Sequence, residues 1–278
     1  MIASALALLL MQVGPNPSLD AYPGVPEELR DRAPRKQESE RPEPSESGRK
    51  LAECVNLARD DAEAASDFAQ TWRETAASQL ELAQSAHCLG LALVRQRDFA
   101  EAQRAFDLAA SEVPDGAPAY QARLAAMAGN AAMAQDKPAI AEIAFAQAQT
   151  FATQASDGPL AASVSVDRAR ALVALGRNDE AALALAAARG DDPANARAWL
   201  LSATLSRRLE RLGEAREQIA QAALLAPQDP AVGLEAGVIA ALAGREEEAR
   251  RSFESVLEVA PQSEEATRAR SYLEQLAT

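Results

Sequence analysis

Small residues recur at fixed intervals along residues 83–261 of this 278-residue chain. With Ala83 counted as position 1, positions 8, 20, 24, 27 and 32 hold Gly90, Ala102, Phe106, Ala109 and Pro114. Counted from Ala196, the same positions hold Ala203, Ala215, Ile219, Ala222 and Pro227. Units shifted by 34 residues hold Ala169, Ala181, Leu185, Ala188 and Pro193 on one side, and Gly237, Ala249, Phe253, Val256 and Pro261 on the other. A fifth unit, offset by a short insertion, holds Gly129, Ala141, Phe145 and Ala148. The chain therefore repeats one structural unit about five times.

Close packing of helices explains this spacing. Two helices of a unit are expected to cross where positions 8 and 20 meet, because only glycine or alanine lets their backbones approach. Position 24 carries a large apolar side chain that fills the space beside the crossing, and position 27 meets the next unit. Proline at position 32 ends the second helix, since it lacks the N–H that would continue the hydrogen-bond ladder. Turns within the units are predicted at residues 97–98, 176–179, 211–213 and 244–245.

The composition favours helices throughout. The chain is rich in Ala, Leu, Arg, Gln and Glu, which favour helices, and only 4% of its residues are aromatic. A β-sandwich or a doubly wound sheet would need more Val, Ile, Tyr and Thr. The net charge of -13 argues against nonspecific binding to nucleic acid or to an acidic membrane surface.

The repeated template resembles the tetratricopeptide repeat, a helix–turn–helix unit of 34 residues. This resemblance implies an all-α fold, a right-handed α-solenoid of about five such repeats between a degenerate N-terminal hairpin and a C-terminal capping helix. The repeat domain is predicted at residues 48–278, with repeats at about 83–116, 122–155, 162–195, 196–229 and 230–263 and a cap at 263–276. The first hairpin, at residues 50–73, is degenerate because Phe68 stands where the template expects alanine.

The N-terminal segment differs from the repeats. Residues 1–21 are predicted to be a signal peptide, because the apolar run at residues 2–13 matches a signal-peptide core and is shorter than the ~20 residues that span a bilayer. No Lys or Arg precedes this run. Residues 22–47 are rich in proline and are predicted to be a disordered linker. We expect a periplasmic or secreted protein with no stable membrane insertion after signal cleavage; the alternative is a cytoplasmic protein with a stray apolar tail.

The sequence offers little for catalysis. The only histidine, His87, is followed by Cys88, but adjacent helical residues point about 100° apart and do not form a dyad. No second histidine or close cysteine completes a metal site, and there is no glycine-rich phosphate loop. We therefore expect a protein without enzymatic activity, metal or cofactor, in which His87 is structural or lines a groove.

Two cysteines, Cys54 and Cys88, occupy equivalent positions in neighbouring first helices. When a protein contains only two cysteines, they often form a disulfide in an oxidising compartment. Neighbouring helix axes, however, lie ~8–10 Å apart, whereas a disulfide needs Cα atoms within about 7 Å. The sequence is therefore compatible with two alternatives, a disulfide between Cys54 and Cys88 or two small buried thiols.

The resemblance also implies a binding surface. In tetratricopeptide arrays, positions 2, 5, 9, 12 and 13 of the first helices face a concave groove. The polar residues expected there are Arg95, Arg123, Asn130, Arg170, Arg197, Thr204, Arg207 and Arg208. Arginine forks bind carboxylates, so this groove is expected to bind an extended peptide with acidic side chains or a C-terminal carboxylate. The alternative is that these arginines pair with neighbouring acids. The carboxylate clamp of chaperone-binding members is not reproduced, because Ala126 stands where its lysine should be.

These observations predict a non-catalytic protein–protein interaction scaffold of the bacterial periplasm or cell envelope. Its partner is expected to be an extended segment of a protein, not nucleic acid. Two alternatives are a self-assembling structural module and the regulatory subunit of an envelope enzyme complex.

Overall fold

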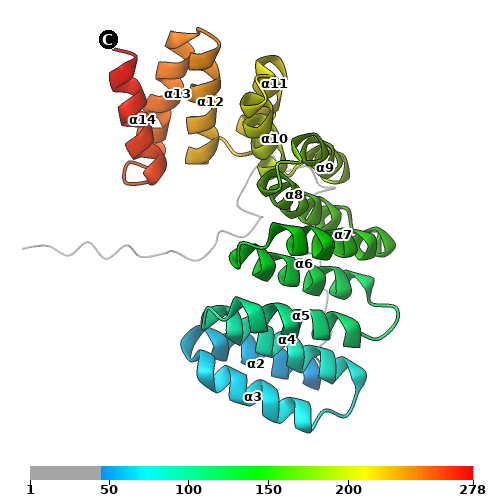
Figure 1. Ribbon diagram of the computed structural model, residues 1–278. Coiled ribbons are helices and arrows are strands. Elements are labelled where there is room, and N and C mark those ends of the chain that lie inside the picture. Colours follow the sequence, from blue (N-terminus) through cyan, green and yellow to red (C-terminus); the bar gives the residue numbers. More distant parts are fainter. Residues whose placement is uncertain (1–44, 278) are drawn as a thin grey trace, which may run out of the picture. The chain divides into compact units, whose positions relative to one another are not determined.

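The computed structural model describes residues 45–277, and these form a succession of helices (Figure 1). The predicted signal peptide and nearly all of the predicted linker lie outside the described residues. Within residues 45–277 there is no strand, so the all-α prediction is confirmed. The helices are α2 (Glu46–Asp60), α3 (Ala62–Glu74), α4 (Gln79–Arg95), α5 (Phe99–Glu112), α6 (Pro118–Ala134), α7 (Pro138–Ala155), α8 (Gly158–Ala174), α9 (Asn178–Asp191), α10 (Ala196–Arg208), α11 (Leu212–Leu225), α12 (Pro230–Leu242), α13 (Glu246–Val259) and α14 (Glu264–Gln275).

The helices pair into hairpins, and each hairpin packs on the next. The even-numbered helices α2 to α12 are the first helices of the hairpins, and the odd-numbered helices α3 to α13 are the second. First helices contact one another in the pairs α2–α4, α6–α8, α8–α10 and α10–α12, whereas second helices make no comparable contacts with one another in the described part of the chain. The first helices therefore lie on the inside of the stack. We call their exposed faces the inner surface and those of the second helices the outer surface.

Position 8 of each repeat packs directly against position 24. A Cβ added to Gly90 would lie 2.5 Å from the ring of Phe106, and one added to Gly129 would lie 2.6 Å from the ring of Phe145. Gly237 is as tightly covered by Phe253. Position 20 is also fully buried, as Ala102, Ala141, Ala181, Ala215 and Ala249. The small residue at position 8 thus makes room for the position-24 side chain of the second helix.

The turn inside each hairpin is the same structure five times. In each of these turns the residue at position 15 has a positive φ. The five residues are Arg97, Asp136, Gly176, Glu210 and Gly244. The amide of the next residue donates to the carbonyl five residues earlier, as from Arg177 to Leu172 at 2.9 Å and from Arg211 to Ser206 at 2.8 Å. This is the Schellman motif, which satisfies the carbonyls at the end of the first helix. Four of these turns lie at or next to the predicted positions, although residues 178–179 and 212–213 already belong to α9 and α11; the turn at Asp136 was not predicted.

The first hairpin departs from this pattern. Its turn has no left-handed residue; Asp61 has an extended backbone, and its side chain accepts a hydrogen bond from the amide of Ala64 at 2.9 Å. Cys54 and Cys88 are joined by a fully buried disulfide with their Cα atoms 5.8 Å apart. The disulfide links α2 to α4; because Cα atoms lie about 2.3 Å from a helix axis, facing Cα atoms come this close between helices at ordinary spacing.

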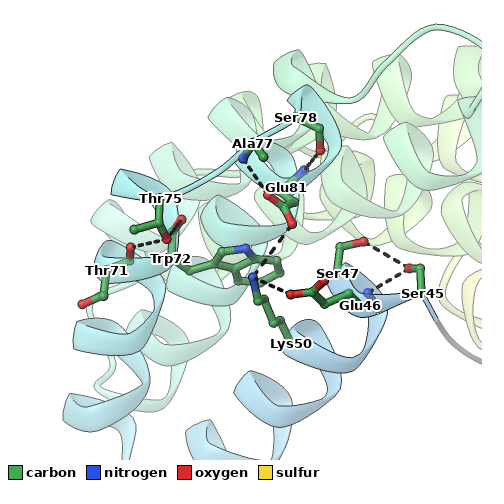
Figure 2. A network of polar contacts seen from close by, with 11 residues as sticks. Ser45, Glu46, Ser47, Lys50, Thr71, Trp72, Thr75, Ala77, Ser78 and Glu81 are labelled. Atoms are coloured by element: carbon green, nitrogen blue, oxygen red, sulfur yellow. Dashed lines mark hydrogen bonds and ion pairs between the residues drawn. The ribbon is translucent and has the colours of Figure 1, made fainter.

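Polar contacts at the other end of α2 reinforce this link (Figure 2). Lys50 Nζ lies 3.5 Å from a carboxylate oxygen of Glu46 and 4.0 Å from one of Glu81. Glu81 also accepts a hydrogen bond from the amide of Ala77 at 2.7 Å and donates its own amide to Ser78 Oγ at 3.2 Å. Ser78 therefore caps α4 at its N-terminus while Glu81 binds the preceding turn.

Helix α14 closes the other end of the stack. Its small residues Ala266 and Ala269 are fully buried against α13, and Tyr272 stacks on Phe253 with ring centroids 5.3 Å apart. Arg250 donates to the backbone carbonyl of Leu276 at 3.0 Å. Since Arg268 faces solvent, α14 covers the last apolar face with a polar outer side, as a solenoid cap requires.

Candidate peptide-binding surface

A pocket of about 210 Å³ opens on the inner surface between α8 and α10. These are the first helices of two neighbouring hairpins. The lining residues are Ala169, Arg170 and Val173 of α8, Leu185 of α9, and Leu201, Thr204, Leu205 and Arg208 of α10. Three groove residues expected from the sequence, Arg170, Thr204 and Arg208, therefore surround one pocket.

The walls of this pocket are mainly apolar. Ala169, Leu185 and Leu205 are buried and form its base, while Val173 and Leu201 are half-buried and form its sides. The hydroxyl of Thr204 donates to the backbone carbonyl of Leu200 at 3.0 Å, so its donor is already used. The pocket thus presents apolar surface with two guanidinium groups at its edge.

The two arginines at the pocket are exposed. Arg208 has no hydrogen-bond or ion-pair partner within residues 45–277. Arg170 lies 3.4 Å from Asp167, and 47% of its side chain is exposed. Asp167 uses one of the five N–H donors of Arg170, so both guanidinium groups keep donors for a ligand.

Other expected groove arginines are held by acids. Arg207 donates to Glu235 of α12 through Nε at 2.6 Å and Nη2 at 3.2 Å, a two-point contact between neighbouring first helices. Arg123 lies 3.5 Å from Asp157, whose carboxylate also caps α8 by accepting from the amide of Leu160. For Arg207 the expected alternative, pairing with a neighbouring acid, describes the structure, whereas Arg123, like Arg170, makes one longer ion pair.

The remaining expected residues divide in the same way. Asn130 donates to Asp167 at 3.4 Å, and Arg95 donates to the carbonyl of Ala58 at 3.3 Å and so caps the end of α2. Arg197 is exposed and has no partner within the described range. Within the described range, the expected groove arginines without any partner are therefore Arg197 and Arg208 of α10, and Arg170 of α8 makes only the contact with Asp167.

His87 is buried behind the inner surface. Its Nδ1 lies 3.0 Å from the hydroxyl of Tyr120, and its ring is 6.2 Å from that of Phe106 between centroids. Burial lowers the pKa of His87 to about 4 and raises the pKa of Tyr120. His87 is therefore neutral near pH 7, and the neighbouring Cys88 is in the disulfide.

No further chemistry is apparent in the part of the chain that the structure describes. It contains no group of three or more His, Cys, Asp and Glu side chains placed to hold a metal ion. No described helix has both the length and the apolar character that crossing a membrane requires.

Residues 166–231 match the family model described as tetratricopeptide repeat. This stretch runs from the middle of α8 to the start of α12 and contains the pocket between α8 and α10. The chain resembles tetratricopeptide repeat proteins. No curated protein sequence matches it.

Solved tetratricopeptide-like structures share its fold. PilW, a type IV pilus biogenesis factor, is 17% identical with a TM-score of 0.64, and the alignment covers 84% of this chain and 98% of PilW. Pseudomonas aeruginosa PilF is 14% identical with a TM-score of 0.62, over 81% of this chain and 99% of the other. YrrB, a TPR protein with an unusual peptide-binding site, is 19% identical with a TM-score of 0.50, over 67% and 91%. At these identities the likeness establishes an α-solenoid of repeats, as predicted.

Two inner-surface acids were not foreseen from the sequence. Asp167 and Glu235 both occupy position 6 of their repeats and bind polar groups of the preceding first helix. Position 6 also carries Leu201, which lines the pocket. The signal that could have identified them is their shared position, which lies next to an expected groove position.

Proposed function

We propose that this chain is a non-catalytic scaffold that binds an extended segment of a partner protein on its inner surface. The observation that carries this proposal is the pocket between α8 and α10, whose apolar lining and exposed arginines come from two neighbouring repeats. Extended segments bind well to such surfaces, because a row of equivalent positions contacts successive residues. The unusual peptide-binding site of YrrB gives a precedent for peptide binding on this fold.

Site-specific photocrosslinking in the source cell tests this proposal. A crosslinking amino acid would replace Arg197 or Arg208 on the inner surface, and Arg216 or Arg251 on the outer surface as matched controls. All four arginines are exposed, so none of the replacements should disturb folding. We expect one partner protein to crosslink at the inner positions only. Crosslinks that form equally at the outer positions would contradict an inner-surface site.

We also propose that the protein works in the periplasm or another part of the cell envelope. The apolar N-terminal run and the buried disulfide between Cys54 and Cys88 support this location, because structural disulfides persist in oxidising compartments. Mass spectrometry after thiol labelling of the natural protein tests it. We expect no labelled cysteine before reduction and two after it. Two labelled cysteines without reductant would place the protein in a reducing compartment.

Self-assembly is a second candidate, favoured by apolar side chains on the outer surface. Ile143 of α7 and Leu183 of α9 occupy the same position in neighbouring repeats, and 67% and 72% of their surfaces are exposed. Light scattering over a range of concentrations distinguishes this function. A mass that rises with concentration in the natural protein but not in Leu183→Asp supports self-assembly through the outer surface. A constant monomer mass excludes it.

A further inference from the structure

The pocket between α8 and α10 is of a size that suits one side chain. Its volume of about 210 Å³ falls below the roughly 300–1,000 Å³ of pockets that hold drug-sized ligands or cofactors. Its base and sides are aliphatic, from residues such as Leu185, Leu201 and Leu205. An aliphatic side chain that enters it would lose contact with water at little polar cost.

The charge at this pocket is opposite to that of the protein. Two arginines and no acidic residue line it, although the chain carries a net charge of -13. Pockets on the outer surface differ, since acids such as Asp179 and Glu214 line the one between α9 and α11. The pocket on the inner surface therefore attracts carboxylates, while its outer counterparts present both signs of charge.

The two arginines stand at different heights of the pocket. Arg170 is at position 9 of its repeat and belongs to α8, whereas Arg208 is at position 13 and belongs to α10, one turn further along a neighbouring helix. Arg208 has no ion-pair partner within the described residues, and Arg170 makes one ion pair, with Asp167 at 3.4 Å. An extended segment that crosses the pocket would pass one arginine before its central side chain and the other after it.

We propose that this pocket anchors an internal partner segment in which one aliphatic residue is flanked on both sides by acidic residues. This inference rests on the proposed inner-surface function and adds the chemistry of the partner. The aliphatic side chain fills the pocket, and the flanking carboxylates accept hydrogen bonds from Arg170 and Arg208. We choose acidic side chains over a terminal carboxylate because Arg170 and Arg208 belong to different helices and lie at different positions along them.

Fluorescence anisotropy with a synthetic probe tests the proposal on the full chain. The probe is acetyl-Gly-Glu-Asp-Leu-Asp-Glu-Gly-amide, with both ends capped and a dye on an added lysine. We expect saturable binding that weakens as salt is raised. Replacing the leucine of the probe by glycine, or its four acids by lysine, should weaken binding by about tenfold or more.

Variants of the protein locate the site. Arg170→Ala and Arg208→Ala should each weaken binding of the capped probe several-fold, and Thr204→Trp, which fills the mouth of the pocket, should abolish it. Arg216→Ala on the outer surface is the matched control and should leave binding unchanged. Thermal melting by circular dichroism would show that each variant is folded; if Thr204→Trp does not fold, the two exposed arginine variants still decide the question.

Several results would overturn the proposal. These are no binding of the capped probe at millimolar concentration, equal binding of the lysine-substituted probe, or unchanged affinity in the arginine variants. Binding of a leucine-terminated peptide only when its C-terminal carboxylate is free would also overturn it and favour a terminal anchor. If the natural partner still crosslinks at Arg197 or Arg208 in those cases, the inner-surface function stands and only this chemistry is wrong.

Discussion

At the scale of single residues, the side chain at position 24 of each repeat grows as the one at position 8 shrinks. Glycine at position 8 faces phenylalanine in three repeats, at Gly90, Gly129 and Gly237. Alanine takes that position in the other two, as Ala169 and Ala203, and faces Leu185 and Ile219. Each pair fills the crossing to a similar total volume, which is what close-packed interiors require.

This size match predicts the outcome of a double-mutant cycle. Gly237→Ala should reduce the free energy of unfolding by ~1–3 kcal/mol, because the new methyl group overlaps the ring of Phe253. Phe253→Leu in the same chain should recover part of that loss, since it reproduces the pairing found at Ala169 and Leu185. Denaturation in urea measures all four forms; strictly additive effects would mean that the two positions do not share one space.

Burial of His87 predicts a pH dependence of stability. Burial lowers the pKa of His87 from 6.5 to about 4, so the unfolded chain binds more protons at mildly acidic pH. The stability that depends on His87 being neutral is fully present above about pH 6.5 and is lost progressively as the pH falls toward 4. Between pH 7 and 5 the natural protein should lose ~2 kcal/mol of unfolding free energy that His87→Gln retains. Parallel pH profiles of the two proteins would show that His87 is exposed to solvent.

At the scale of elements, the turn at position 15 takes a left-handed residue whether or not that residue is glycine. Gly176 and Gly244 fit this backbone without strain, whereas Arg97 and Glu210 adopt φ values of 64° and 61°. The sequence predicted four of the five turns, because glycine marks two of them and the repeat spacing places two others; the turn at Asp136 was not predicted. It could not predict that charged residues adopt the same conformation, since the packing of the two helices imposes it.

Glycine at these charged positions should therefore stabilise the hairpins. Glu210→Gly removes the unfavourable contact of a Cβ with the backbone, whereas glycine also raises the conformational entropy of the unfolded chain. The net effect should be a free energy of unfolding that is higher by ~0.5–1 kcal/mol. Gly244→Ala should lower it by a similar amount. Chemical denaturation decides; a loss of stability in Glu210→Gly would mean that side-chain contacts of Glu210 outweigh the backbone strain.

For the inner surface, the sequence predicted which residues lie on first helices but not which of them pair with acids. The repeat spacing placed all eight expected groove residues on first helices. It could not separate Arg208, which is available, from Arg207, which binds Glu235. That distinction depends on which residues of two neighbouring first helices face each other, and those residues are 28 apart in the sequence.

At the scale of the whole repeat domain, stability is shared between neighbouring hairpins. Each hairpin contacts its neighbours, so a local change should have local effects. The disulfide between Cys54 and Cys88 closes a segment of 34 residues and links the first hairpin to the second. Because the first hairpin lacks the regular turn of the others, we expect it to rely on this bond.

Removing the disulfide should loosen the first hairpin alone. Cys54→Ser with Cys88→Ser should cost ~3–4 kcal/mol for a closed segment of this length. Hydrogen exchange measures where that loss falls: protection should drop in α2 and α3 and remain unchanged in α12 to α14. A uniform loss of protection would show that the domain unfolds as one cooperative unit.

Partner binding on the inner surface should protect the first helices from hydrogen exchange. Hydrogen exchange of the full chain, with and without the capped acidic peptide, measures it directly. We predict that the peptide increases protection in α8 and α10, around Arg170 and Arg208, and leaves α11 and α13 unchanged. Increased protection confined to α9, α11 or α13 would contradict the central claim that this repeat protein binds its partner on the first helices.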